Sequence, residues 1–116
     1  MKTDIELFGK CPYVTAQKVF SGKWSVLIIY HLSASTLRYG ELQRKMGKLT
    51  SATLTKQLRM LEDYGLVSRH VYSEVPPKVE YSLTELGKEF QPVLDQFRIW
   101  GDKYISSMQE PMSDNS

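Results

Sequence analysis

Cysteine is scarce in this sequence, in which Cys11 is the single one among 116 residues. An intramolecular disulfide requires two cysteines, so any disulfide would have to join Cys11 to another molecule. Disulfide frameworks belong to oxidising compartments, and a chain without one suits a reducing compartment. The cysteine content therefore favours a cytoplasmic location.

Long apolar runs are also missing. A membrane-spanning helix needs about 20 consecutive apolar residues, whereas the longest dense apolar run here covers residues 26–30. The first six residues contain neither the apolar stretch nor the cleavage site of a secretory signal peptide. We expect a soluble, cytoplasmic protein with no membrane partner.

The sequence has little net charge, and its charges are unevenly distributed. The formal net charge is +2, and residues 38–83 carry eight Lys and Arg against five Asp and Glu, whereas residues 84–116 carry three against six. The basic middle segment is compatible with a nucleic-acid partner, although nucleic-acid-binding domains are usually more strongly basic. Charge alone permits such a partner without establishing it.

Residue patterns of enzymes and metal sites are absent. The sequence contains no glycine-rich phosphate loop, no nucleophile elbow and no His and Cys residues at metal-ligand spacing. His31 and His70 fall in different predicted elements, so neither has a second ligand nearby in the sequence. We predict no enzymatic activity, no cofactor and no metal.

Helical patterns fill the first part of the chain. Cys11 suits a helix cap, Pro12 the first helical position and Gly22 a position beyond the helix end. A second helix is expected over residues 23–32. Apolar residues at spacings of three and four predict the core faces of the two helices: Tyr13, Ala16, Val19 and Phe20, then Trp24, Leu27, Ile28 and Leu32.

Residues 33–64 have the pattern of a helix-turn-helix. A polar break over residues 33–36 is followed by a short helix that ends at Gly47, and Thr50 or Ser51 can cap the helix predicted over residues 51–64. The apolar residues of these two helices recur at helical spacing: Tyr39, Leu42 and Met46, then Leu54, Leu58 and Leu61.

The face of the second helix opposite its leucines is polar. Hydroxyl groups can contact base edges in the major groove of DNA, and Lys or Arg can bind phosphates or guanine. An ordinary solvated helix face is the alternative, because exposed Lys and Arg are common on helices. Arg38, just before the motif, is either a phosphate contact or a surface charge. The candidate DNA-binding residues of the helix are Ser51, Thr53, Thr55, Lys56 and Arg59.

Alternating apolar residues near 67–71 and 79–83 predict two strands of a hairpin. The prolines between them cannot donate ladder hydrogen bonds and therefore mark the loop at the hairpin tip. A helix-turn-helix followed by a hairpin is a winged helix, so the predicted fold class is α+β, mostly α, with a two-stranded wing. Arg69 and Lys78 of the wing are expected to lie near the DNA backbone or minor groove.

A long amphipathic helix is predicted from its cap, Thr84, to about residue 107, with a kink or break near residues 89–91 caused by Pro92. Its apolar stripe exceeds what a winged-helix core of this size can cover, so we expect a C-terminal dimerisation helix. A pocket for a planar effector, shared with Trp24, is the alternative. The candidate interface residues are Phe90, Leu94, Phe97, Trp100 and Tyr104.

The length of the chain suits one domain. We expect it to span residues 1–108 and to include the N- and C-terminal dimerisation helices. Residues 111–116 are small and polar, and we expect a disordered tail over residues 109–116.

Short motifs are spread over most of the chain. They are Cys11-Pro12, Gly22-Lys23-Trp24, Leu37-Arg38-Tyr39, the leucine repeat from Leu54 to Leu61, Gly65-Leu66-Val67, and the run from Pro76-Pro77 through Tyr81-Ser82-Leu83-Thr84 to Gly87. Together they resemble the HxlR-type family of bacterial winged helix-turn-helix transcriptional regulators, within the MarR-like superfamily. The resemblance covers about residues 9–106. It implies a homodimer that binds inverted-repeat operators in double-stranded DNA, with its recognition helix at residues 51–64 and its wing at residues 67–83.

The resemblance also places the family's N-terminal cysteine at Cys11, and some relatives sense electrophiles or oxidants through this residue. A helix N-terminus and the nearby Lys10 favour a thiolate, so Cys11 is a candidate redox sensor. A chemically idle cap is the alternative. The predicted effector is either an oxidant or a small molecule. The alternative function is a winged-helix protein-protein interaction module without DNA binding, which would explain the modest positive charge.

Overall fold

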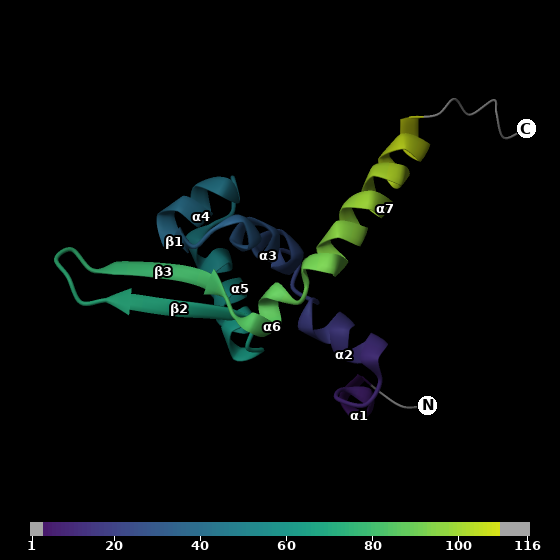
Figure 1. Ribbon diagram of the computed structural model, residues 1–116, viewed down its shortest axis with the longest axis horizontal. Coiled ribbons are helices and arrows are strands. Elements are labelled where there is room, and N and C mark those ends of the chain that lie inside the picture. Colours follow the sequence, from purple (N-terminus) through teal and green to yellow (C-terminus); the bar gives the residue numbers. More distant parts are fainter. Residues whose placement is uncertain (1–3, 110–116) are drawn as a thin grey trace, which may run out of the picture.

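The computed structural model describes residues 4–109 as a mainly helical fold with one small sheet (Figure 1). This architecture confirms the predicted α+β, mostly α class. The helices are α1 (Asp4–Leu7), α2 (Pro12–Val19), α3 (Ser25–Ala34), α4 (Tyr39–Lys45), α5 (Ser51–Asp63), α6 (Glu85–Lys88) and α7 (Gln91–Gln109). The strands are β1 (Leu37–Arg38), β2 (Val67–Tyr72) and β3 (Lys78–Leu83).

The sheet is antiparallel, with the strand order β1-β3-β2. β2 and β3 form the predicted hairpin, in which Val67 pairs with Leu83 at the root. Figure 1 shows this hairpin projecting away from the helices as a wing. β1 adds a third strand by pairing Leu37 with Tyr81. The sequence analysis missed β1, because two residues are too few to show an alternating pattern.

Side chains from α3, α4 and α5 meet in the core beneath the sheet root. The leucines predicted to anchor α5 are among the side chains that are essentially inaccessible to solvent. Close-packed burial of this kind fixes the rotation of each helix about its own axis. The most deeply buried apolar residues are Ile28, Ile29, Leu42, Leu54, Leu58 and Leu61.

Three residues predicted to lie in the core, Tyr13, Ala16 and Leu27, are exposed. Leu27 retains 39% and Tyr13 84% of their accessible surface, whereas Ile29, outside the predicted stripe, is fully buried. α3 is apolar on every side over residues 26–30, so residue spacing cannot show which side meets the core. α2 has no fully buried residue, and much of its apolar surface therefore lies outside the core.

The turn of the helix-turn-helix follows the predicted residue chemistry. Gly47 has a φ of +76°, a conformation that glycine adopts without steric strain. Thr50 is the N-cap of α5, and its side chain accepts a hydrogen bond from the backbone N–H of Thr53 at 3.2 Å. The choice between Thr50 and Ser51 as cap is therefore settled in favour of Thr50. The Ser51 side chain remains available for other contacts.

The end of α5 is tied directly to the start of α6. Gly65 has a φ of +80° and turns the chain from α5 into β2. The Thr84 hydroxyl donates to the Gly65 carbonyl oxygen at 2.6 Å and accepts from the Gly87 N–H at 3.1 Å, which confirms Thr84 as a helix cap. A Cβ atom at Gly87 would overlap the backbone oxygen of Leu66. These contacts hold the root of the wing against α6.

The predicted long C-terminal helix is interrupted where the sequence analysis expected it. α6 ends at Lys88, and α7 starts at Gln91 with Pro92 as its second residue. Proline fits the first turn of a helix because its missing N–H would have no intrahelical partner there. α7 continues to Gln109, two residues beyond the predicted end. The rest of the predicted disordered tail, residues 110–116, lies outside the described residues.

The molecule is elongated because α2 and α7 diverge from the central body (Figure 1). Its radius of gyration is 17.4 Å, against about 13 Å for a compact chain of this length. Phe20, just after α2, stacks on Phe90 with ring centroids 3.9 Å apart. None of the helices between residues 4 and 109 is both long and apolar enough to cross a bilayer.

The packing of Gly87 generates a stability prediction. Gly87→Ala should lower the free energy of unfolding by about 1–3 kcal/mol, because the added methyl group meets backbone that cannot move aside easily. Thermal unfolding followed by circular dichroism measures this loss. Gly40→Ala is the matched control, since its Cβ would meet only an Arg44 side-chain atom at 3.7 Å. Equal melting temperatures for Gly87→Ala and the parent protein would show that the α6 contact is loose.

Candidate nucleic-acid interface

The face of α5 that points away from the core is open to solvent. Lys56 and Arg59 lie on it with Ala52 and Asp63, and all four residues are exposed. The spacing of three between Lys56 and Arg59 places both cations on one side of the helix. Burial of the three leucines on the opposite side fixes this orientation. The structure therefore presents the two basic residues outward, as the sequence predicted.

The hydroxyl groups near the start of α5 are held in place by hydrogen bonds. The Gln43 side-chain amide donates to the Ser51 hydroxyl at 2.9 Å. The Thr50 hydroxyl donates to the Thr53 hydroxyl at 3.0 Å. Ser51 is exposed, whereas Thr53 is only half exposed. Since a hydroxyl that accepts one hydrogen bond can still donate another, Ser51 can also contact an external acceptor.

Tyr39 connects the two helices of the motif. Its phenol donates to the Ser51 carbonyl oxygen at 3.0 Å and lies 3.1 Å from the Thr55 hydroxyl. Thr55 is therefore engaged within the motif and is less available to a ligand than Ser51. The sequence analysis assigned Tyr39 only to the apolar pattern of α4 and missed its polar role. The signal was present, because a buried tyrosine ring usually places its hydroxyl at a hydrogen-bond partner.

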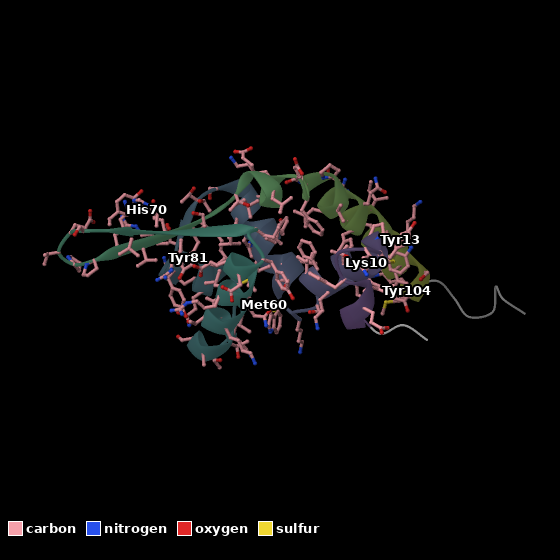
Figure 2. All side chains as sticks on the ribbon, turned by 90° about the horizontal axis from the view of Figure 1, so that it is seen from below. Lys10, Tyr13, Met60, His70, Tyr81 and Tyr104 are labelled. Carbon is pink, nitrogen blue, oxygen red and sulfur yellow. The ribbon has the colours of Figure 1, made fainter. Side chains whose placement is uncertain are left out.

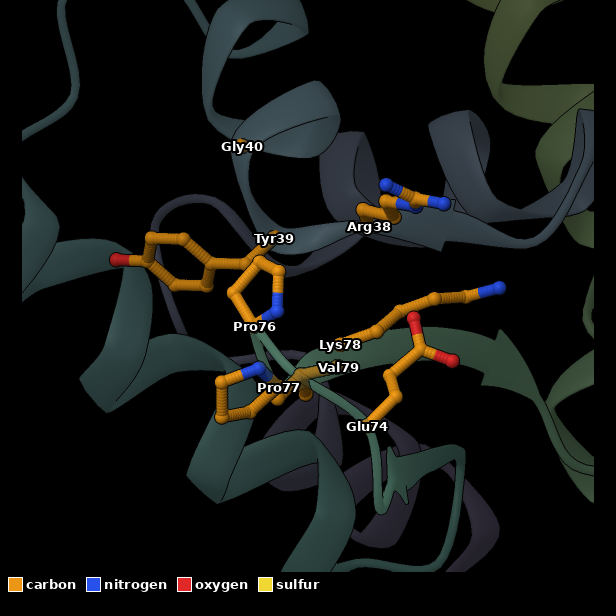
Figure 3. Close-up of a pocket in the computed structure, with 8 residues that line it drawn as sticks. All are labelled: Arg38, Tyr39, Gly40, Glu74, Pro76, Pro77, Lys78 and Val79. Atoms are coloured by element: carbon orange, nitrogen blue, oxygen red, sulfur yellow. The ribbon is translucent and has the colours of Figure 1, made fainter.

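Arg38 and Lys78 come from separate segments and line one cavity of about 400 Å³. The cavity lies between the start of α4 and the wing loop, with Tyr39, Pro76 and Pro77 along its other side. Figure 3 shows the Arg38 and Lys78 side chains extending in the same direction beside Glu74. The structure thus brings together two predicted DNA-binding residues that stand 40 positions apart in the sequence.

Lys78 is partly neutralised by its neighbours. Its ammonium lies 3.5 Å from a Glu80 carboxylate oxygen and 4.5 Å from the centre of the Tyr72 ring. The Tyr72 hydroxyl donates to Glu80 at 2.9 Å. This hydrogen bond, aided by the charges of Lys78 and Arg38, lowers the pKa of Glu80. Glu80 therefore remains ionised at neutral pH and offsets part of the positive charge of the cavity.

Arg69 contacts the recognition helix. Its Nε lies 3.3 Å from Oε1 of Glu62 in α5. Arg69 was expected to lie near the DNA backbone or minor groove, and Glu62 was not singled out from the sequence. Nothing in the sequence pairs these residues, because their approach depends on how the wing folds back against α5. The pairing means that part of the Arg69 charge is already compensated within the protein.

Cys11 lies far from this basic surface along the long axis of the molecule. It is the N-cap of α2, as predicted, and its thiol is half exposed and makes no side-chain cap hydrogen bond. Figure 2 shows the neighbouring Lys10 and Tyr13 toward the same end as Tyr104 of α7, with Tyr81 and His70 toward the other end. The described residues contain no group of His, Cys, Asp and Glu that could hold a metal ion.

The apolar surface of α7 is divided between the core and solvent. Phe97, Trp100 and Tyr104 are exposed by 54%, 65% and 55%. Leu94, also predicted at the interface, is instead buried in the core of its own chain, with 7% exposure. Phe90 is half buried and lines an apolar cavity of about 260 Å³ between α2 and α6. Three of the five predicted interface residues are therefore free to meet another molecule.

His31 stands apart from both surfaces. It lies in α3, where partial burial and then the charge of Lys45 lower the pKa of its imidazole. The ring therefore remains neutral at physiological pH. Its ring packs 5.1 Å from that of Tyr30.

Comparisons with known proteins agree with this geometry. The family model of the HxlR-like helix-turn-helix matches residues 19–109. The uncharacterized HTH-type transcriptional regulator YdeP of Bacillus subtilis is 44% identical over 97 residues, which cover 84% of this chain and 76% of YdeP.

Solved structures of regulators share the fold. The redox regulator HypR in its reduced form superimposes with a TM-score of 0.79 at 40% identity, over 84% of this chain and 97% of HypR. The reduced form of the transcriptional regulator YodB from B. subtilis gives a TM-score of 0.72 at 32% identity, over 81% of this chain and 93% of YodB. The arrangement of α4, α5 and the wing, together with the family match over most of its length, shows that the chain belongs to the HxlR-like helix-turn-helix family.

Proposed function

We propose that this protein is a sequence-specific DNA-binding transcriptional regulator, which acts in the cytoplasm as a homodimer on an inverted-repeat operator and has no enzymatic activity of its own. The observation that carries the proposal is the outward display of Lys56 and Arg59 on the second helix of a helix-turn-helix. The family match and the regulators among the relatives support the same function.

The dimensions of α5 suit the major groove. A helix of 13 residues is about 20 Å long, and the major groove of B-DNA, about 12 Å wide, admits such a helix. In helix-turn-helix proteins the N-terminal part of the recognition helix contacts base edges. Ser51 at this end offers a hydroxyl, and Lys56 and Arg59 further along offer charged donors for guanine or phosphate.

The cavity beside the wing suits a DNA phosphate. Arg38 of β1 and Lys78 of β3 both line it, and cations that approach a phosphate release condensed counterions. Glu80 competes with the phosphate for Lys78, since the two already form an ion pair. We therefore assign the larger part of this phosphate contact to Arg38, whose guanidinium can also donate two parallel hydrogen bonds to it.

A second copy of the chain is the proposed partner for the exposed stripe of α7. Burying one large apolar side chain contributes about 1.5–3 kcal/mol, and Phe97, Trp100 and Tyr104 are each more than half exposed. Trp100 stacks on Tyr104 with ring centroids 5.3 Å apart, so part of the surface is already ordered. A twofold pairing through α7 would point two recognition helices at the two halves of a symmetric operator.

We also propose that Cys11 makes the regulator responsive to oxidants. Cys11 is half exposed at the start of α2, so an oxidant in solvent can reach it. HypR, solved in both oxidised and reduced forms, is a redox regulator of similar structure. Because the chain has one cysteine, oxidation joins two Cys11 thiols of different chains, or Cys11 and a small thiol, with loss of two electrons and two protons.

The basic face of α5 generates the first functional prediction. Lys56→Ala and Arg59→Ala should each weaken binding to the DNA upstream of the protein's own gene about tenfold, and should reduce the dependence of log K on log salt by about one. Fluorescence anisotropy across a salt series measures both quantities. Arg98→Ala is the control, because Arg98 is also a charged, exposed residue but lies in α7, where it pairs with Asp102 of the same helix.

The same experiment separates this function from its alternative. Unchanged affinity in both α5 variants would show that another face binds DNA. Failure of the parent protein to bind specifically at micromolar concentration would favour the protein-protein interaction module.

The stripe on α7 generates a prediction about assembly. Trp100→Asp should raise the dissociation constant of the dimer about 100-fold or more, because two copies of an apolar contact are lost and two charges are desolvated. Sedimentation velocity over a concentration series measures this constant. Val75→Asp is the control, since Val75 is 98% exposed in the wing loop. A Trp100→Asp protein that stays dimeric would place the interface elsewhere.

The Cys11 proposal is tested with the thiol oxidant diamide. Treatment should convert the parent protein to a disulfide-linked dimer, or to a mixed disulfide when glutathione is present, and should change its operator affinity. Diamide takes up the two electrons and two protons and becomes the hydrazine. Cys11→Ser should show neither change by mass spectrometry or by anisotropy. An equal response of operator affinity in the parent protein and Cys11→Ser would exclude a sensing role for this thiol.

A further inference from the structure

An ion pair joins the recognition helix to the wing. Arg69 Nε of β2 lies 3.3 Å from Glu62 Oε1 of α5, and the two side chains are only 39% and 19% exposed. Three other ion pairs in the part of the chain that the structure describes, within β3, α6 and α7, each connect residues of a single element. The pair between Glu62 and Arg69 therefore links two parts of the DNA-binding surface that could otherwise move separately.

The Glu62 carboxylate is turned inward, away from the open face of α5. Its second oxygen, Oε2, is inaccessible to solvent and has no hydrogen-bond partner among the described residues. A charged oxygen in this position is unfavourable unless a nearby cation compensates it. Arg69 provides that compensation, so the two residues depend on each other.

Tyr81 packs where these side chains meet. It pairs with Arg69 across the sheet and is 6% exposed. Burial raises the pKa of its phenol, and the negative charge of Glu62 raises it further, whereas Arg69 and Arg59 act in the opposite direction. The electrostatic influence of all three charges on one buried ring shows that they gather at the junction of α5 and the wing.

We propose that Glu62 and Arg69 are positioning residues, which fix the angle between the recognition helix and the wing and thereby allow both to contact DNA at once. This inference rests on the proposed DNA-binding function. Only Tyr64, Gly65 and Leu66 separate α5 from β2, and the hairpin extends well beyond the body (Figure 1). The ion pair braces the hairpin against the last turn of α5, so Arg69 acts through Glu62 and makes no contact with phosphate.

The direction in which Glu62→Ala changes operator affinity separates this role from direct phosphate binding. If Arg69 bound phosphate, Glu62→Ala would free its positive charge and remove a negative one near DNA, and operator binding would become tighter. If the pair positions the wing, Glu62→Ala misaligns it, and binding becomes weaker despite the more favourable charge.

The test compares Glu62→Ala, Arg69→Ala and the double variant by fluorescence anisotropy across a salt series. Each single variant should weaken operator binding about fivefold. The double variant should bind the operator with an affinity no lower than that of the weaker-binding single variant. The salt slope should stay unchanged. Asp63→Ala is the matched control, because it removes the same charge from the neighbouring, exposed position, and it should bind at least as tightly as the parent protein.

Two DNA-binding results would overturn the proposal. One is tighter binding by Glu62→Ala, and the other is a salt slope reduced by about one in Arg69→Ala. Thermal unfolding shows whether each variant folds. Arg69→Lys, which keeps the charge but loses the guanidinium geometry, replaces Arg69→Ala if that protein is unfolded, and it should also bind more weakly.

Hydrogen exchange in the DNA-free protein tests the brace independently of the proposed function. Glu62→Ala and Arg69→Ala should both accelerate exchange of the β2 and β3 amides, and the reversed pair Glu62→Arg with Arg69→Glu should restore protection. Unchanged exchange in both single variants overturns the brace whether or not DNA binds. Accelerated exchange in a protein that fails to bind DNA specifically overturns the DNA-binding function alone.

Discussion

The structure depends on the burial of three leucines along one side of α5. Leu54, Leu58 and Leu61 are at most 1% exposed, and truncating one such side chain to alanine typically costs about 2–5 kcal/mol. No other rotation of α5 would bury all three. This constraint directs Lys56 and Arg59 outward and brings Glu62 against the wing. It also leaves Thr50, the N-cap of α5, exposed at the start of the helix. The candidate DNA-binding surface is therefore a consequence of core packing.

The long axis of the molecule separates two kinds of surface. The wing, α4 and α5 form a polar and basic end, whereas α2 and α7 carry apolar side chains at the other end (Figures 1 and 2). Cys11 belongs to the apolar end. Under the proposed function, a covalent change at Cys11 would reach the DNA-binding surface by altering how two copies pair, since the interface would set the distance between the two recognition helices.

Sequence patterns predicted the features that depend on local chemistry. Gly47 at the turn and the interruption before Pro92 were recognisable because few residues tolerate those backbone positions. Features that depend on tertiary contacts were missed or misassigned. The spacing in α3 could not separate Leu27 from Ile29, and Leu94 entered the core although its position in the stripe resembles that of Phe97. No pattern within either segment pairs Glu62 with Arg69.

The central claim is that the outward face of α5 lies in the major groove. Photocrosslinking with the upstream DNA containing 5-iodouracil, followed by mass spectrometry of the digested complex, locates this contact directly. We expect crosslinks to peptides within α5, between residues 51 and 59, with weaker crosslinks in the wing loop. Crosslinks confined to α2 or α7, with α5 unmodified, would contradict it.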